Sequence, residues 1–444
     1  MRHSFVHPAR TVEGPPPSKA PRHGLRWMAW WLAVLMVFRP HELIPQLSVV
    51  RPVILTSILA IGVLLVQARW ERILAQPQTR WIAAYFAWAL MTMPFALHRS
   101  GTVPILQKML VFVLLAALVA SFPPGIGALR SLIDRMLVAF VGFAVIVLVV
   151  GKQSTEVGRI QGVTSYDPNE LAALAVTFFG LALGTFRSPR WGMRLVGLAS
   201  VLLSLILVVR SGSRGGAIAA IVALAATLIL LRGRWRILAI ASISVFALLA
   251  MSTPTFRQRV VSIGSVSDDY NVTSYNGRVE IWKRGLGYLV EHPVTGVGVN
   301  NFTEMEGQIR SETLVRGIWL NAHNMFVQVG AELGFLGLGI FLAMIWTAWR
   351  GALANWRARA SRLAMPEVLI ALIGIVISGF FLSFAYSELL IFTLVVSAAA
   401  GTEWKAGSRA ATPRAPASGA RRRRGGSAFN PRSNVPMAFR HTSG

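Results

Sequence analysis

Two arginines separated by a Ser-Gly-Ser spacer, Arg210 and Arg214, are the first residues whose types and spacing could do chemistry. The pair Gly215-Gly216 follows them directly. A guanidinium group matches phosphate oxygens with two parallel hydrogen bonds, and a tight turn before a helix exposes backbone N–H groups. The segment therefore predicts an anion site. The alternative is that the two arginines only extend to lipid head groups.

Arg278 and His323 are the next candidates, and both precede stretches with a helical pattern. Because imidazole titrates near neutral pH, His323 could take a proton from a hydroxyl group. A structural histidine is the alternative. For Arg278 the alternative is a local ion pair with Glu280 or Glu306.

A polar stripe follows His323 at every fourth residue: Asn324, Gln328 and Glu332. Residues four apart lie on one helix face. Asn324 can cap the helix, and Glu332 would lie ~12 Å deeper at ~1.5 Å per residue. We expect Glu332 to face protein or water rather than lipid, because an intramembrane carboxylate is costly in hydrocarbon.

Composition restricts the chemistry available to these residues. The chain has no Cys, which excludes disulfides, thiolate ligands and cysteine catalysis. It also shows no His-x-x-x-His, Asp-x-Asp or carboxylate cluster typical of a metal site. We therefore expect neither metal nor cofactor, and arginines that neutralise phosphate charge.

The elements that must position these residues lie in a membrane. Of the 444 residues, 54% are hydrophobic and only 14% are charged, against ~25% charged in soluble domains. This composition predicts an all-α polytopic membrane protein. The net charge of +26 could suggest a nucleic-acid partner. The arginines cluster between apolar runs, as they do in the cytoplasmic loops of membrane proteins, so we exclude a nucleic-acid partner.

Apolar runs of helical length predict about twelve transmembrane helices. They are expected at about 25–38, 49–66, 81–97, 104–122, 132–150, 171–186, 195–209, 215–231, 236–252, 324–349, 366–383 and 387–400. A polar stretch separates the last two ranges. If they instead form one long span, the total is eleven transmembrane helices.

Arginine-rich connections alternate with arginine-poor ones, which predicts that both termini are cytoplasmic. We expect a disordered cytoplasmic segment over 1–24, spans one to nine over 25–252, a large periplasmic loop over 253–323, spans ten to twelve over 324–400, and a disordered basic cytoplasmic tail over 401–444. The polar segments 151–170, 210–216 and 253–323 then share one membrane face. This face is where function is expected.

The chain resembles the bacterial O-antigen ligase and O-antigen polymerase superfamily. The matching pieces are Ser211-Gly212-Ser213-Arg214-Gly215, Gly277-Arg278 with Trp282, Pro293 with Gly296 and Gly298, His323-Asn324 with Glu332-Leu333-Gly334, and Asp167-Pro168-Asn169-Glu170. The resemblance runs from about 160 to 350. It departs at Arg39-Pro40-His41-Glu42, to which we assign no role, and a fainter similarity to exopolysaccharide or protein-sorting ligases leaves the acceptor open.

The resemblance implies a GT-C-like helical fold in the bacterial inner membrane and metal-independent, inverting transfer of a glycan from an undecaprenyl-diphosphate carrier. It places the catalytic roles on Arg214, Arg278 and His323. Combined with the residue pattern, it suggests that Arg210, Asn324 and Glu332 help to bind the diphosphate or glycan, and that Glu332 or Glu280 orients His323.

Three functions remain open at this point. A ligase would transfer the glycan to a lipid, protein or glycan acceptor. A polymerase of the same superfamily would join lipid-linked repeats. A transporter of lipid-linked glycans is the third interpretation, but it expects paired halves and a midplane site, and the sequence shows no similarity between its halves.

Overall fold

The computed structural model describes residues 23–43, 46, 49–123, 125–151, 159–160, 166–261, 274–312, 319–359, 361 and 364–411. Over these residues the chain forms helices and no strand element, so the all-α prediction is confirmed for this part of the chain. Most of the two terminal segments predicted to be disordered lies outside the described residues. The last helix continues to Ala411, beyond the end at residue 400 that the sequence suggested.

A helix occurs at each predicted span. These helices are α1 (His23–Val37), α4 (Pro52–Gln67), α6 (Pro77–Thr92), α7 (Arg99–Ala120), α8 (Ile126–Val150), α9 (Pro168–Ala182), α10 (Trp191–Ser211), α11 (Arg214–Leu230), α12 (Arg234–Ser252), α17 (Met325–Arg357), α18 (Glu367–Gly379) and α19 (Glu388–Ala411). Six of the described helical stretches, in α7, α8, α9, α10, α12 and α17, are long and apolar enough to cross a membrane. The others are shorter or less apolar. The protein is therefore a multi-pass membrane protein, and the total of twelve spans stays a prediction.

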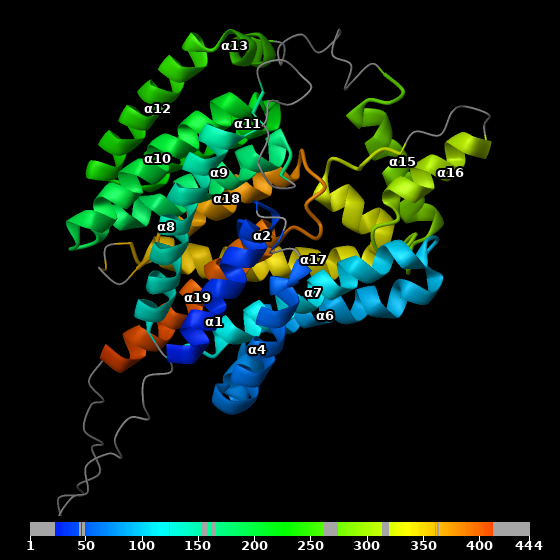
Figure 1. Ribbon diagram of the computed structural model, residues 1–444, viewed down its shortest axis with the longest axis horizontal. Coiled ribbons are helices and arrows are strands. Elements are labelled where there is room, and N and C mark those ends of the chain that lie inside the picture. Colours follow the sequence, from blue (N-terminus) through cyan, green and yellow to red (C-terminus); the bar gives the residue numbers. More distant parts are fainter. Residues whose placement is uncertain are drawn as a thin grey trace, which may run out of the picture.

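Short helices complete the described chain. They are α2 (Pro40–Leu43), α5 (Trp70–Ala75), η1 (Met93–Phe95) and η2 (Leu183–Arg187), and, within the predicted large loop, α13 (Pro254–Val261), α15 (Arg278–Glu291) and α16 (Phe302–Glu312). Figure 1 shows α15 and α16 beside one end of α17, whereas α13 follows the end of α12.

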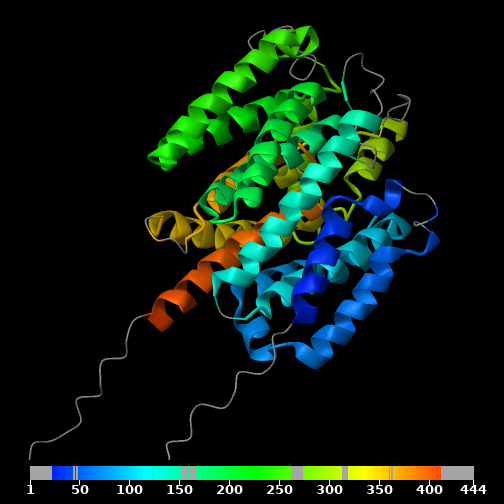
Figure 2. The same cartoon turned by 60° about the vertical axis from the view of Figure 1, so that its left-hand side comes forward.

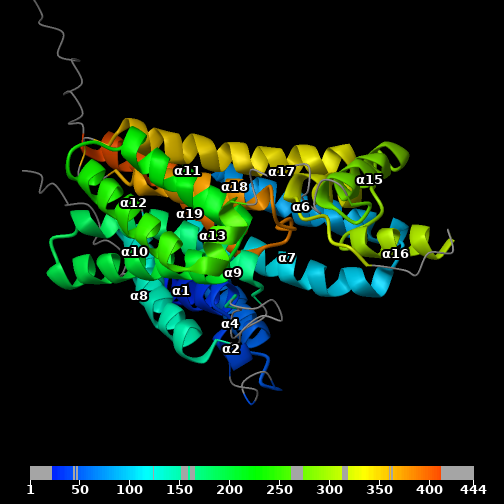
Figure 3. The same ribbon diagram turned by 90° about the horizontal axis from the view of Figure 1, so that it is seen from above.

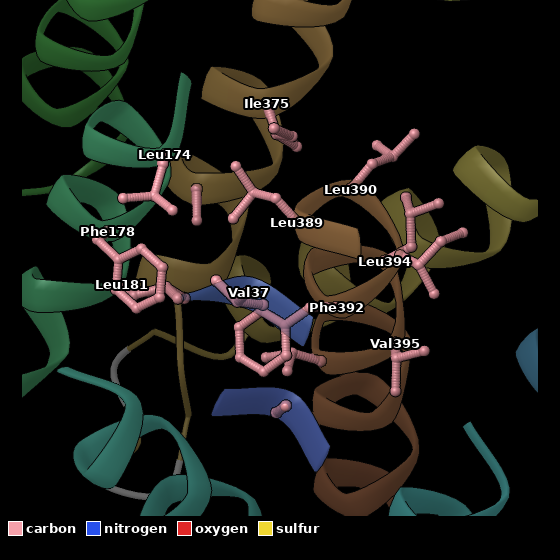
Figure 4. Packing of buried hydrophobic residues seen from close by; sticks show 14 of the residues in the cluster. Val37, Leu174, Phe178, Leu181, Ile375, Leu389, Leu390, Phe392, Leu394 and Val395 are labelled. Atoms are coloured by element: carbon pink, nitrogen blue, oxygen red, sulfur yellow. The ribbon is translucent and has the colours of Figure 1, made fainter. Parts of the chain in front are cut away.

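The core lies where α9, α18 and α19 pack together in the middle of the molecule. Phe178 on α9 stacks on Phe140 of α8 with ring centroids 4.7 Å apart. Figure 4 shows Phe178, Val37 and Phe392 among the buried side chains of this core. In Figure 2 the green helices α10 to α12 and the blue helices α1 and α4 lie on opposite sides of the orange-red α19. The packed interior fixes the helix ends that carry the candidate site.

Helix α17 runs along one edge of the molecule (Figure 3) and is broken at Gly334, whose φ is 68°. This break corrects the uninterrupted span expected over 324–349. The preceding loop docks on it: Val297 N donates to Ala331 O (2.9 Å), and Phe335 N donates to Pro293 O (2.9 Å). A Cβ on Gly296 would lie 2.3 Å from the carbonyl carbon of Glu332, so only glycine permits this approach.

Candidate functional site

The amino-terminal ends of three helices, α9, α11 and α15, meet the carboxyl-terminal end of α18 at one place on the molecule. A small cavity there is lined by residues from the start of α9, the α10–α11 turn, the start of α15 and the end of α18: Asn169, Ser213, Gly215, Gly216, Arg278, Ser378, Phe381 and Leu382. His323, two residues before α17, is close enough to Arg278 and Asp167 for both charges to shift its pKa. Helix amino termini carry a partial positive charge, so their convergence favours an anion.

The α10–α11 turn places Arg214 at the first residue of α11. Gly212 ends α10 with φ 60°, and the Ser213 hydroxyl accepts a hydrogen bond from Gly216 N (3.0 Å). A Cβ on Gly215 would lie 2.7 Å from Phe381 Cβ, and one on Gly216 would lie 2.3 Å from Ala172 Cβ. The two glycines therefore let α11 start directly against its neighbours, as the sequence motif predicted in outline.

The predicted arginines of this turn differ in exposure. Arg214 is half-buried beside the cavity-lining residues Ser213 and Gly215, whereas Arg210 is exposed in the last turn of α10. Arg214 therefore lies closer than Arg210 to the edge of the cavity.

A third arginine, Arg159, is buried beneath the same turn and was missed as a site residue. Its Nε donates to Ser211 O (2.8 Å), and its Nη2 donates to Asn169 Oδ1 (3.3 Å). These bonds join the start of α9 to the end of α10. The only signal in the sequence was a basic residue in a connection predicted to be outside, where positive charge is scarce.

The start of α9 is a capping box formed by Asp167 and Glu170. Asp167 Oδ1 accepts from Asn169 N (2.6 Å) and Glu170 N (2.8 Å), and Glu170 Oε2 accepts from Asp167 N (3.3 Å). The arrangement fixes the helix start. It therefore holds the amide of Asn169 at the cavity.

Arg278 is the first residue of helix α15 and lines the cavity. Arg284, further along the helix, pairs with Glu306 of α16 through two bonds, Nε to Oε1 (2.8 Å) and Nη2 to Oε2 (2.7 Å). Glu280 pairs with Lys283 (2.7 Å). The two carboxylates considered as local partners of Arg278 are thus engaged by other cations of the same helix.

His323 has an unusual backbone and a shifted pKa. Its φ is 48°, and its N–H donates to Ser383 Oγ (2.9 Å). Burial, followed by the positive charge of Arg278, lowers the pKa of His323 to about 4, although Asp167 acts in the opposite direction. The imidazole is therefore neutral at pH 7 and able to accept a proton. Its pKa is well below the near-neutral value on which the sequence interpretation relied, so His323 is a weaker base than an ordinary histidine.

The polar stripe of α17 binds neighbouring backbone. Asn324 Oδ1 caps α17 by accepting from Phe326 N (2.9 Å) and Val327 N (3.2 Å), as predicted. The Glu332 carboxylate is buried, as predicted for a group facing protein, and is contacted from two sides. Its donors are Asn300 N (3.0 Å), Phe302 N (3.2 Å) and Tyr386 OH (2.7 Å). Glu332 thus fixes the loop after α15 and the α18–α19 connection.

A wide groove of about 620 Å³ opens between α1, α4 and α7. Apolar side chains line most of it, and Arg39, Lys108 and Glu388 lie among its polar residues. Arg39 Nη2 and Lys108 Nζ bond the two oxygens of Glu388 at 2.9 and 2.8 Å. Arg39 also stacks over Tyr166, 4.8 Å from its ring centroid. Because Tyr166 directly precedes Asp167, the polar end of the groove lies next to the start of α9.

Metal ligation was not expected, and the part of the chain that the structure describes contains no group of three or more His, Asp or Glu side chains able to hold a metal ion. The cationic groups near the cavity are arginines.

Residues 199–342 match the protein family described as O-Antigen ligase. No curated protein matches the chain. The matched segment covers α10 to the middle of α17, and so includes Arg214, Arg278 and His323. The chain therefore carries a domain of the O-antigen ligase family over residues 199–342.

Proposed function

We propose that this protein is a membrane ligase that transfers a glycan from an undecaprenyl-diphosphate carrier to an acceptor hydroxyl at the periplasmic face of the bacterial inner membrane. The observation that carries the proposal is the convergence of three helix amino termini with Arg278 and His323, two residues of the segment that matches the O-antigen ligase family. Both chain termini would be cytoplasmic.

In this proposal the acceptor oxygen attacks carbon 1 of the donor sugar as the bond from carbon 1 to the phosphate oxygen breaks. The electron pair of that bond leaves with the diphosphate, where negative charge grows. Arg214 and Arg278, assisted by Arg210, stabilise this charge more in the transition state than in the ground state. His323 takes the acceptor proton. Direct displacement inverts the configuration at carbon 1.

The helix starts add to the arginines because their dipoles are fixed before the substrate arrives. Preorganised dipoles need no rearrangement during the reaction. Asn324 and Glu332, which bond protein backbone, would contribute by holding His323 and the α15 loop in place. The proposal also includes a direct contact of Asn324 or Glu332 with the glycan.

The apolar groove between α1, α4 and α7 is suited to the lipid chain of the donor. Its polar end at Arg39 and Lys108 adjoins the start of α9, so a lipid with its chain in the groove would present its head group toward the cavity. This assignment gives a role to the Arg39-Pro40 segment, which the sequence left without one.

Glycan patterns in a strain lacking the protein distinguish the functions. Loss of all acceptor-linked glycan indicates a ligase. A single repeat still attached to the acceptor indicates a polymerase, the second candidate within the same superfamily. Accumulation of undelivered carrier-linked glycan on the cytoplasmic side would indicate a transporter and would contradict the proposal.

Purified protein with a synthetic lipid-diphosphate donor tests the mechanism directly. We expect transfer in the presence of a chelator, because arginines occupy the place where a metal would neutralise phosphate. Full loss of transfer on chelation, restored by magnesium, would contradict this part of the proposal.

A further inference from the structure

A second basic pocket lies at the opposite ends of the helices that form the candidate site. Its volume is about 430 Å³, and its described lining residues are Arg187, Leu231, Arg232, Trp235, Arg357, Arg359 and Pro366. They come from the connections η2–α10, α11–α12 and α17–α18. Helix α10, which is 21 residues long, begins near this pocket and ends at the candidate site, which separates the two by ~30 Å at ~1.5 Å per residue.

Four guanidinium groups converge on this pocket, and none of its described lining residues is acidic. Glu367, next to Pro366 in the chain, is buried and does not line the pocket, but its charge interacts with that of Arg187. Like charges at close range repel one another. With a single nearby carboxylate against four guanidinium groups, an anion in the pocket would offset this repulsion, and guanidinium groups suit phosphate oxygens.

Two of the four arginines are held by the protein itself. Arg187 Nη1 donates to Ala364 O (2.7 Å), and its Nη2 donates to Arg359 O (2.7 Å). Arg359 lies over the Trp356 ring, 4.4 Å from its centroid, and its Nη1 donates to Trp356 O (3.2 Å). The Trp356 indole in turn donates to Leu230 O (2.9 Å). These contacts give the pocket a defined shape, whereas Arg232 and Arg357 are exposed at its edge.

The surroundings of the pocket are those of a membrane boundary. It lies at the ends of apolar helices, and Leu231 and Trp235 provide apolar surface beside the arginines. Tryptophan is enriched at the level of lipid head groups, and basic pockets between helices bind phosphate-bearing head groups.

We propose that this pocket binds the head group of an anionic phospholipid with two phosphates, as in cardiolipin. Four guanidinium groups provide two cations for each of two phosphodiester groups, and the apolar surface beside them accommodates the start of the acyl chains. The site is separate from the proposed transfer reaction and does not depend on it.

Binding is tested on the full-length protein in nanodiscs of phosphatidylcholine with or without cardiolipin. Lipid retention is measured by native mass spectrometry and stability by thermal unfolding. We expect cardiolipin to raise the melting temperature and to remain bound. The double variant Arg232→Gln/Arg357→Gln should bind it roughly 10- to 30-fold more weakly, from the loss of two surface charges at ~1 kcal/mol each.

Arg236→Gln is the matched control, because Arg236 is exposed one turn after Arg232 and is not among the described lining residues. It should retain cardiolipin like the native protein. Equal retention by the double variant and the control would overturn the proposal. Equal stabilisation by phosphatidylglycerol, or by soluble glycerol phosphates without lipid, would overturn the assignment to a head group with two phosphates.

Discussion

The indole Nε1 of Trp282 donates a hydrogen bond to the carbonyl oxygen of Ala322 at 2.9 Å. Trp282 lies one turn after Arg278 on α15, and Ala322 directly precedes His323. This bond joins the arginine-bearing helix to the histidine-bearing segment, beside the buried hydrophobic cluster that includes Ile281 and Ala322. It helps to set the relative position of the two proposed functional groups.

Trp282→Phe removes this donor but keeps an aromatic ring. A neutral hydrogen bond contributes ~1 kcal/mol, so turnover should fall about fivefold. Trp346→Phe, at a side chain that is 61% exposed on α17, is the control and should retain native turnover. Steady-state kinetics of glycan transfer measure both variants, and native turnover in Trp282→Phe would show that the bond does not position the site.

Arg214→Lys and Arg278→Lys should each lose most activity, because an ammonium group cannot form the two-point contact of guanidinium with phosphate. Losing one charge-assisted contact of ~1.5–3 kcal/mol corresponds to roughly a 10- to 150-fold fall in turnover. Arg236→Lys, at the far ends of the helices, serves as the control. If both site variants keep donor affinity and turnover, positive charge alone is sufficient and the two-point contact is wrong.

His323→Ala should lower turnover about 10²- to 10⁴-fold, the usual contribution of a general base. Donor binding should be nearly unchanged, since the base acts on the acceptor. Donor affinity by equilibrium binding and turnover at matched membrane expression separate the two effects. Native turnover would remove His323 as the base.

The pH dependence of kcat/KM follows from the neutral state of His323. Because its pKa is lowered to about 4, the base stays unprotonated as the pH falls from 7 to 5, and its loss appears only near pH 4. Arg278→Gln removes one cause of the lowering, so the residual activity of this variant should show an acid limb at higher pH. An acid limb near pH 6.5 in the native enzyme would mean that another state of His323, or another base, controls the rate.

Gly334→Ala should destabilise the protein, because the residue has φ 68° and an added Cβ would lie 2.3 Å from Val294 O. A left-handed conformation alone costs a non-glycine residue ~1–3 kcal/mol. Gly339→Ala is the control on the same helix, since no atom lies within 4 Å of its added Cβ. Thermal unfolding followed by size-exclusion fluorescence should show a lower midpoint only for Gly334→Ala.

Much of the helix arrangement is readable from apolar runs, and α11 begins within a residue of its predicted start because a serine and two glycines mark it. The cap by Asn324 and the burial of Glu332 were also predictable, since both follow from the local pattern of α17. Arg214, Arg278 and His323 were predicted as site residues from the chemistry of arginine and histidine together with the family resemblance.

Other features depend on contacts between distant segments. Arg159 reaches the carbonyl of Ser211, 52 residues away, and no local pattern announces such a bond. At the break in α17, the loop at Pro293 and Val294 lies directly against Gly334, and Phe335 N donates to Pro293 O instead of to a carbonyl of its own helix. Sequence periodicity carries no information about which loop approaches a helix, so the span was predicted to be continuous.

The convergence of three helix starts has a consequence for genetics. Every residue type except proline keeps its backbone N–H, so a substitution by any other residue leaves the helix dipoles at the cavity in place. Point mutations of Arg214 or Arg278 should therefore leave a low residual activity in cells. Complete loss of the glycan would instead point to damage at Gly215 or Gly216, where a side chain would push the helix starts apart.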